Sequence, residues 1–286
     1  MKTVTFCRRA VTIAPAALLA ACIGSQPPIG APGAMPQSSP AGESAQSRSL
    51  RSNGDDYKVS GALVYVTNSN PAYSSVTVYD AKSDNPNPIT TISTDIFEPV
   101  GSCVDRDGTL YVANQTGSGP GWVSEYLLGE TEPLRIITDG INTPSYCAID
   151  GHGNLWVSNV GDRTVTEYLK GSTTPHATLS KGLTYPGGIA IDRGGSTYVA
   201  NYSPPNVQVF PPGGTTPKRT ITDGIIEPGG IALDRDGTLY VPNLVPCNVE
   251  EYRAGQSKPY RGADPLSRAV FDYISGGLTP PFVLSG

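Results

Sequence analysis

The chain has 286 residues, with 33 Gly, 27 Pro and 38% hydrophobic residues. So many residues that interrupt helices exclude a mainly helical protein and favour short strands joined by turns. The formal net charge is −5, and no basic pattern stands out. An acidic chain of this kind argues against nucleic acid as a partner and against electrostatic binding to anionic lipid.

The N-terminal segment, residues 1–21, has the order of a secretory signal peptide. Lys2, Arg8 and Arg9 precede an apolar run over residues 10–21 that is too short to span a bilayer comfortably. The run ends in LAAC, Leu19 to Cys22, which resembles the lipobox of bacterial lipoproteins. The resemblance implies cleavage before Cys22, lipidation of Cys22, and a protein held at a membrane of the cell envelope. The alternative is a secreted protein without a lipid.

Residues 22–56 predict a lipid-anchored, disordered tether. Pro, Gly, Ser, Ala and Gln dominate the segment after Cys22 and no apolar period is present, so the segment cannot bury a core. A flexible chain of this length averages about 30 Å from end to end. We therefore expect a globular head over residues 57–286, close to the membrane surface.

One phrase recurs along this head. GGIAIDRGGSTYVAN, residues 187–201, is followed by GGIALDRDGTLYVPN, residues 229–243. The aromatic residue of the phrase recurs at spacings, by subtraction, of 46, 45, 42 and 42 residues, in Tyr65, Tyr111, Trp156, Tyr198 and Tyr240. A period of about 40–50 residues is typical of propeller blades with four strands each.

Each unit is interpreted as four short strands, A to D. Strand A begins at the prolines of PGGIAID and its variants, strand B is the aromatic phrase, strand C is VTEY or its variants, and strand D is LRIIT or KRTIT. Alternation with a period of two and bounding Gly, Pro, Asn and Asp residues support this parsing. The fold class predicted is all-β, a β-propeller of four-stranded antiparallel blades.

The two ends of the head predict how the ring closes. The first phrase, LVYVTN, has no strand A before it, whereas the last residues, TPPFVLSG from Thr279 to Gly286, align with PGGIAID. We expect the C-terminal strand to complete the N-terminal blade, which yields five blades, because an open blade edge would stay exposed. The alternative is an incomplete ring of six or seven blades.

The repeats resemble NHL repeats, and they are also similar to the repeats of streptogramin lyases and of gluconolactonase-type propellers. The resemblance covers residues 63–286, nearly the whole head. It implies the propeller architecture, but it does not choose a function, because function depends on sites rather than on folds.

Two polar residues recur in the repeats, and both have a structural interpretation. An Asp ends strand A and a Gly follows it three residues later, in Asp105, Asp150, Asp192 and Asp234. A tight turn explains this spacing better than bound Ca²⁺ does. An Asn ends strand B in all five units, in Asn68, Asn114, Asn159, Asn201 and Asn243. We expect these Asn residues to cap strand ends.

The residue before the proline of strand A differs between units. The series consists of Glu98, Thr143, Tyr185, Glu227 and Thr279. Similarity to gluconolactonase-type propellers implies a divalent metal near the channel mouth. Glu98 and Glu227, together with Asn114 and Asn243, are the candidate ligands for Ca²⁺ or Mg²⁺, since such ions prefer carboxylate and amide oxygens. Ordinary surface glutamates are the alternative, and no cofactor is required by the sequence.

Histidine and cysteine limit the chemistry. Streptogramin lyases use His residues with Mg²⁺, but His152 lies in a turn and His176 at the start of a strand D, so we expect both to be exposed. Cys103 and Cys147 lie on consecutive A strands at registers one apart, which allows either a disulfide or two small buried side chains. Cys247 is expected to be unpaired.

Three functions follow from these observations. The favoured one is a lipoprotein, expected to be a monomer, whose propeller face recognises a protein, peptide or glycan, because no catalytic constellation is evident and Tyr residues suit contact surfaces. The alternative is a metal-dependent lyase or lactonase. The third, a structural role in an envelope assembly, is not separated from the first by the sequence.

Overall fold

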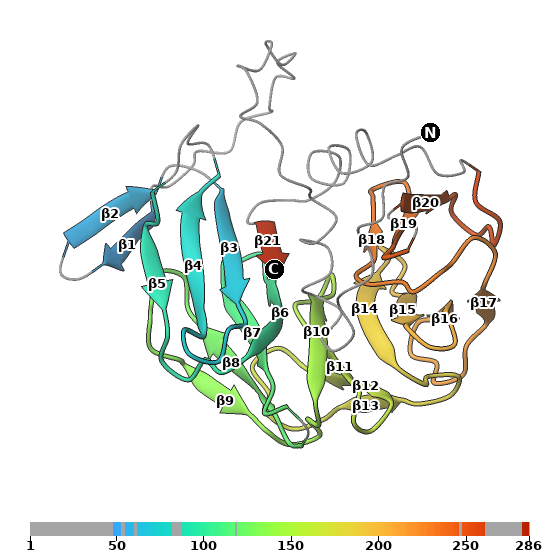
Figure 1. Ribbon diagram of the computed structural model, residues 1–286, viewed down its shortest axis with the longest axis horizontal. Helices are drawn as coiled ribbons and strands as arrows, with labels where there is room; N and C mark the ends of the chain where they lie inside the picture. Colours follow the sequence, from blue (N-terminus) through green and yellow to red (C-terminus); the bar gives the residue numbers. More distant parts are fainter. Residues whose placement is uncertain are drawn as a thin grey trace, which may run out of the picture.

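The computed structural model describes residues 48–52, 55–59, 62–81, 87–117, 119–245, 248–260 and 282–285. This part of the chain is all-β and forms five blades arranged as a five-bladed β-propeller (Figure 1). No helix in these ranges is long and apolar enough to cross a membrane. The signal peptide, Cys22, Cys247 and Thr279 lie outside the described residues.

The strands follow the predicted order in each blade. Blade 1 contains β21 (Phe282–Ser285), β3 (Leu63–Asn68), β4 (Ser75–Asp80) and β5 (Thr90–Ile92). Blade 2 contains β6 (Pro99–Val104), β7 (Leu110–Asn114), β8 (Trp122–Tyr126) and β9 (Arg135–Ile137). Blade 3 contains β10 (Pro144–Ile149), β11 (Leu155–Asn159), β12 (Thr164–Tyr168) and β13 (Ala177–Leu179).

The last two blades continue this order. Blade 4 contains β14 (Pro186–Ile191), β15 (Thr197–Asn201), β16 (Asn206–Phe210) and β17 (Arg219–Ile221). Within the described residues, blade 5 contains β18 (Ala232–Leu233), β19 (Leu239–Asn243) and β20 (Asn248–Tyr252). Strand A of blade 5 is short, and an isolated bridge between Pro228 and Asn243 marks where it was predicted to begin.

The C-terminal strand completes blade 1, but its direction differs from the prediction. Its alignment with PGGIAID predicts an antiparallel strand A, as β6 is to β7. Instead β21 runs parallel to β3, with Phe282 opposite Val64 and Ser285 opposite Thr67. Parallel and antiparallel ladders both pair the backbone groups of an edge strand. The sequence pattern therefore indicates the place of this strand and not its direction.

A second difference lies at the N-terminal side of the head. β1 (Arg48–Ser52) and β2 (Asp55–Val59) form an antiparallel hairpin in which Leu50 is opposite Tyr57. Within the described residues, strand structure thus starts at Arg48, and the hairpin overlaps the segment predicted to be a tether. The signal for it is the Asn53–Gly54 dipeptide in the sequence, which is typical of two-residue hairpin turns.

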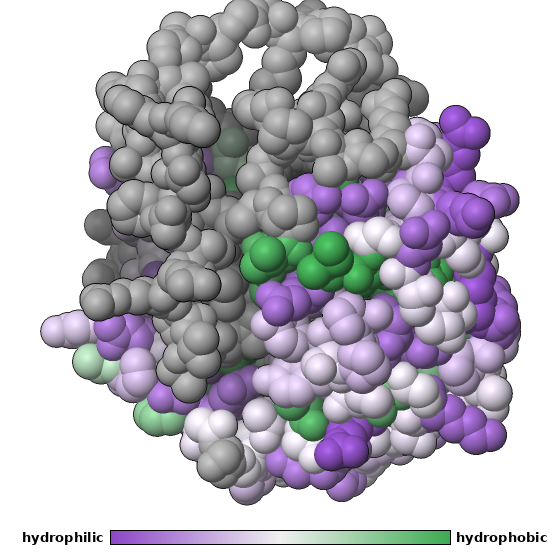
Figure 2. Space-filling model, turned by 45° about the vertical axis from the view of Figure 1, so that its right-hand side comes forward, coloured by the Kyte–Doolittle hydropathy of each residue, from purple (hydrophilic) through white to green (hydrophobic). Residues whose placement is uncertain are grey.

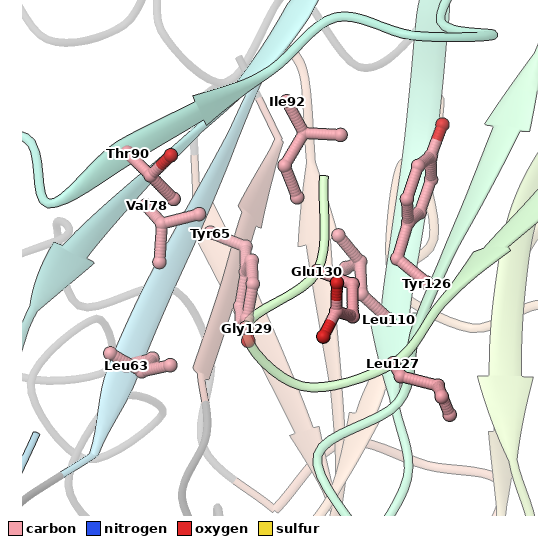
Figure 3. Close-up of a pocket in the computed structure, with 10 residues that line it drawn as sticks. All are labelled: Leu63, Tyr65, Val78, Thr90, Ile92, Leu110, Tyr126, Leu127, Gly129 and Glu130. Carbon is pink, nitrogen blue, oxygen red and sulfur yellow. The ribbon is translucent and has the colours of Figure 1, made fainter. Parts of the chain in front are cut away.

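Within the described part of the chain, the core lies between the blades, in four clusters of buried apolar side chains. Each cluster joins two consecutive blades, from the 1/2 interface to the 4/5 interface. Figure 3 shows the 1/2 interface, where Tyr65 of β3 points toward the loop that carries Gly129 and Glu130. The gap there is about 10 Å³, which holds one water molecule at most. This gap is a packing defect rather than a binding site.

Buried tyrosines at the end of strand C tie neighbouring blades together. The hydroxyl of Tyr126 donates to the Thr94 carbonyl at 2.5 Å, and the hydroxyl of Tyr168 donates to the Asp139 carbonyl at 2.6 Å. Tyr252 makes the same contact in blade 5. Burial raises the pKa of Tyr126 to about 12, so these hydroxyls stay protonated and remain donors at neutral pH.

The innermost strands approach each other closely around the central channel. A Cβ on Gly188 of β14 would lie 2.6 Å from the Ile231 backbone nitrogen, and a Cβ on Gly101 would lie 2.4 Å from the Ser145 carbonyl oxygen. The Tyr146 ring reaches toward Gly187 and Gly230. Gly101 and Gly188 are therefore required by the close approach of one backbone to another.

A disulfide joins blades 2 and 3. Cys103 is opposite Tyr111, whereas Cys147 is opposite Val157, one residue beyond the matching aromatic Trp156. This one-residue difference in register turns the two side chains toward each other across the interface. The Cys103–Cys147 bond spans a Cα–Cα distance of 5.7 Å, which is within the usual range.

Candidate binding face

The two open faces of the propeller are built differently. The loops from strand B to strand C and the connections from strand D to the next strand A form one face, which we call the aromatic face. It carries Tyr73, Phe97, Tyr185, Tyr202 and Ile226. The turns from strand A to strand B and from strand C to strand D form the opposite face, which we call the turn face.

The Asn residues that end strand B hold the aromatic face together. The Asn114 Oδ1 accepts the N–H of Phe97 at 3.0 Å, and the Asn243 Oδ1 accepts the N–H of Ile226 at 2.7 Å. Asn159 and Asn201 make the equivalent bonds in blades 3 and 4. The prediction of strand-end caps is confirmed for these four Asn residues, and each cap fixes the connection that enters its blade. In blade 1 the Asn68 Nδ2 instead donates to the hydroxyls of Ser75 and Thr77.

The Glu98 and Glu227 positions share an uncommon backbone conformation. Their φ angles are 41° and 49°, and Thr143 at the equivalent position has a φ of 48°. The N–H of Leu244 donates to the Glu227 carbonyl at 3.2 Å, and Val160 and Thr143 are paired in the same way. Thr143 has no carboxylate and still adopts this conformation. The conformation is therefore a property of the connection between blades and does not indicate a metal site.

The predicted metal ligands are placed as follows. Glu98 opens blade 2 and Glu227 opens blade 5, and both side chains are half-buried. The amide oxygens of Asn114 and Asn243 accept backbone N–H groups. Over the described ranges, no group of three or more His, Cys, Asp or Glu side chains is placed to hold a metal ion. The metal site stays a prediction that calorimetric titration with Ca²⁺ and Mg²⁺ can test.

Glu227 instead lies beside a pair of tyrosines. The rings of Tyr185 and Tyr202 have centroids 5.7 Å apart and planes tilted by 52°. Burial, and then the nearby Glu227 carboxylate, raise the pKa of Tyr202, so this phenol is neutral at physiological pH. The N–H of Tyr202 donates to the Tyr185 carbonyl at 2.9 Å. This bond fixes the backbone of Tyr202 relative to the backbone of Tyr185.

Other apolar side chains are exposed on the same face. The exposed fractions are 77% for Tyr73, 39% for Phe97, 37% for Tyr185 and 49% for Ile226. In Figure 2, the described surface is largely hydrophilic or neutral, and apolar residues gather in only a few places. Exposed aromatic rings on a rigid scaffold offer large contact areas at low entropic cost.

Sequence reasoning noticed Tyr185 only as one member of a variable series, and it missed Tyr73 and Tyr202. The signal for Tyr202 is its position directly after the capping Asn201, where the chain enters the loop from strand B to strand C. No comparable signal identifies Tyr73, which lies in the loop between β3 and β4.

The turn face confirms two predictions. The Asp105 Oδ1 accepts the N–H of Asp107 at 2.9 Å and that of Thr109 at 2.8 Å, and Gly108 has a φ of 86°. Asp150 and Asp234 close the equivalent turns in the same way, and the Asp192 Oδ1 accepts the N–H of Ser196. The recurring Asp is thus a turn residue. His152 and His176 are both exposed, as expected.

Comparison with known proteins supports the fold alone. No family model matches the chain, and no curated protein matches its sequence. Among solved structures, the chain is similar to hydrazine synthase of Kuenenia stuttgartiensis, with a TM-score of 0.50 and 14% identity. The match covers 72% of this chain and 69% of the other. An identity this low carries no information about activity.

Proposed function

We propose that this chain is an exported lipoprotein with an NHL-like propeller, whose aromatic face recognises a protein, peptide or glycan. The observation that carries the proposal is the gathering of exposed aromatic side chains on one face. Tyr185 and Tyr202 form its best-defined part, because their backbones are hydrogen-bonded to each other and their rings are in contact.

The chemistry of the aromatic face favours binding. Tyrosine rings combine an apolar surface with a polar hydroxyl, and such residues are enriched where proteins make contact. The backbone around them is fixed by the Asn caps, so little ordering is needed when a ligand binds. The Glu227 carboxylate beside Tyr202 adds a hydrogen-bond acceptor.

A glycan array and a displayed peptide library, both probed with the full chain, test this face. We expect at least one class of ligand to bind. The double variant Tyr185→Ala, Tyr202→Ala should reduce that affinity at least tenfold, because aromatic anchors often contribute 2 kcal/mol or more to binding. Leu169→Ala is the matched control, since Leu169 is 44% exposed and lies on the turn face. Equal losses in both variants would contradict the assignment.

Membrane attachment is tested separately. The lipobox-like sequence before Cys22 predicts that the chain incorporates a labelled fatty acid and fractionates with membranes, because two or more acyl chains give stable anchoring. Cys22→Ala should abolish both the label and the membrane fraction. Cys7 lies within the signal segment, so Cys7→Ala should change neither the label nor the membrane fraction. Membrane association of the Cys22→Ala protein would argue against the lipid anchor.

A further inference from the structure

A pocket of about 380 Å³ lies at the interface between blades 4 and 5, on the side of the turn face. Asp192, Tyr198, Lys218 and Arg219 line it from blade 4, and Gly237 and Ala254 line it from blade 5. Its volume is within the range of small-molecule sites. The pocket is separate from the aromatic face, and the proposed function does not use it.

Arg219 in this pocket has no acidic partner. In blade 2, the equivalent Arg135 is opposite Glu125, and its Nε lies 2.9 Å from the Glu125 Oε2. In blade 4, Val209 is opposite Arg219, at the position of Glu125. The Arg219 Nε is buried and has no hydrogen-bond partner, and Arg219 forms no ion pair with any described residue. Elsewhere on the guanidinium, a hydrogen bond joins Arg219 to the Tyr198 phenol. Blade 4 therefore keeps the guanidinium of Arg219 but lacks the carboxylate that Glu125 supplies opposite Arg135 in blade 2.

The space beside Arg219 is also left open by the neighbouring blade. In the matching turns, Lys170 follows Tyr168 and Leu169, whereas Ala254 follows Tyr252 and Arg253. At the 2/3 interface, Lys170 reaches Asp107 of the preceding blade at 2.6 Å. The methyl group of Ala254 is too short for such a contact. Of the three other equivalent positions, Leu128 and Pro212 carry larger side chains, and Ala81 in blade 1 carries the same methyl group.

The charges in the pocket are unbalanced. Lys218 and Arg219 are cationic and Asp192 is the anionic residue among those that line it. The Asp192 Oδ1 accepts the N–H of Ser196 at 2.8 Å, and the Lys218 Nζ donates to the Ser196 hydroxyl at 3.0 Å. Burial raises the pKa of Tyr198, and the Asp192 carboxylate raises it further while Arg219 opposes the rise. Tyr198 is therefore a neutral phenol.

We propose that this pocket binds a small molecule through a carboxylate group, which pairs with the Arg219 guanidinium in place of the missing glutamate. The planar guanidinium matches a carboxylate with two parallel hydrogen bonds. Lys218 adds a second positive charge, and the Ala254 side of the pocket leaves room for the rest of the ligand.

Calorimetric titration of the full chain tests this proposal with acetate, succinate and citrate as probes. Succinamide is the uncharged control for succinate, and inorganic phosphate tests for a site that accepts any oxyanion. We expect at least one carboxylate to bind and succinamide to produce no heat. Arg219→Ala should weaken carboxylate binding at least tenfold.

Two further variants occupy the site from within. Val209→Glu places in blade 4 the carboxylate that blade 2 already has, and Ala254→Leu places there the side chain found at Leu128. Each should weaken carboxylate binding at least tenfold while leaving Arg219 in place, and thermal unfolding checks that each variant is folded. Ala254→Leu keeps the test valid if the buried glutamate prevents folding.

Three results would overturn the proposal. These are the absence of binding by all three carboxylates, tighter binding of phosphate than of any carboxylate, and unchanged affinity in Arg219→Ala. None of them bears on the aromatic face, because that face is tested with different ligands and different variants.

Discussion

The double variant Cys103→Ala, Cys147→Ala is expected to unfold with a free energy about 4 kcal/mol lower than that of the parent chain. The bond closes a loop with a sequence separation of 44 residues. In the chain-entropy model, a disulfide that closes a loop of this length lowers the entropy of the denatured chain, and this stabilises the folded protein by about 4 kcal/mol. Denaturant unfolding measures the change directly, and the thermal midpoint should fall by roughly 10 °C.

Cys247→Ala is the matched control for this experiment, because Cys247 takes no part in the Cys103–Cys147 bond. It should leave the unfolding midpoint of the oxidised protein unchanged. Adding a reductant to the parent chain should reproduce the loss seen in the double variant, and it should have no effect on the double variant itself. A midpoint that does not respond to reductant would show that the bond is absent in solution.

Gly188→Ala is expected to destabilise the ring by about 2–3 kcal/mol. The added Cβ would lie 2.6 Å from the Ile231 nitrogen and 2.7 Å from the Gly230 Cα. Both atoms belong to backbone, so β14 can accept the methyl group only by moving away from blade 5. Overpacking of this kind typically costs about 1–3 kcal/mol, and denaturant unfolding measures it.

Gly187→Ala provides the control one residue away. A Cβ on Gly187 would lie 3.6 Å from the Gly229 carbonyl oxygen, which is an ordinary contact, so this variant should lose much less stability. If both variants lose the same stability, the cause would be the backbone flexibility of glycine. The short distance between the inner strands would then not explain the loss.

The repeats predicted the fold well because each blade uses the same local devices. The aromatic phrase, the turn Asp and the capping Asn each form contacts within a few residues of the sequence or inside one blade. These contacts therefore follow from the spacing alone. The direction of β21 did not follow, because parallel and antiparallel ladders both pair the backbone groups of an edge strand.

The candidate sites were harder to predict, since they depend on differences between blades rather than on the repeated pattern. The sequence does not mark Arg219 as unusual. Its missing partner is recognised only when the strand registers show that Val209 occupies the position of Glu125. Ala254 is likewise unremarkable until its neighbour across the blade interface is known. Tyr73 and Tyr202 lie in loops, where sequence spacing does not determine which side chains meet.

The pairing of β21 with β3 has a consequence for how the chain folds. Phe282 is opposite Val64, a separation of 218 residues by subtraction. Such a distant contact forms only after almost the whole chain has been synthesised, and the loop that it closes is long. Blades 2 to 4 contain only strands that are near one another in sequence, so they can assemble earlier. We therefore expect the blade that starts the propeller to be the last one to be completed during folding.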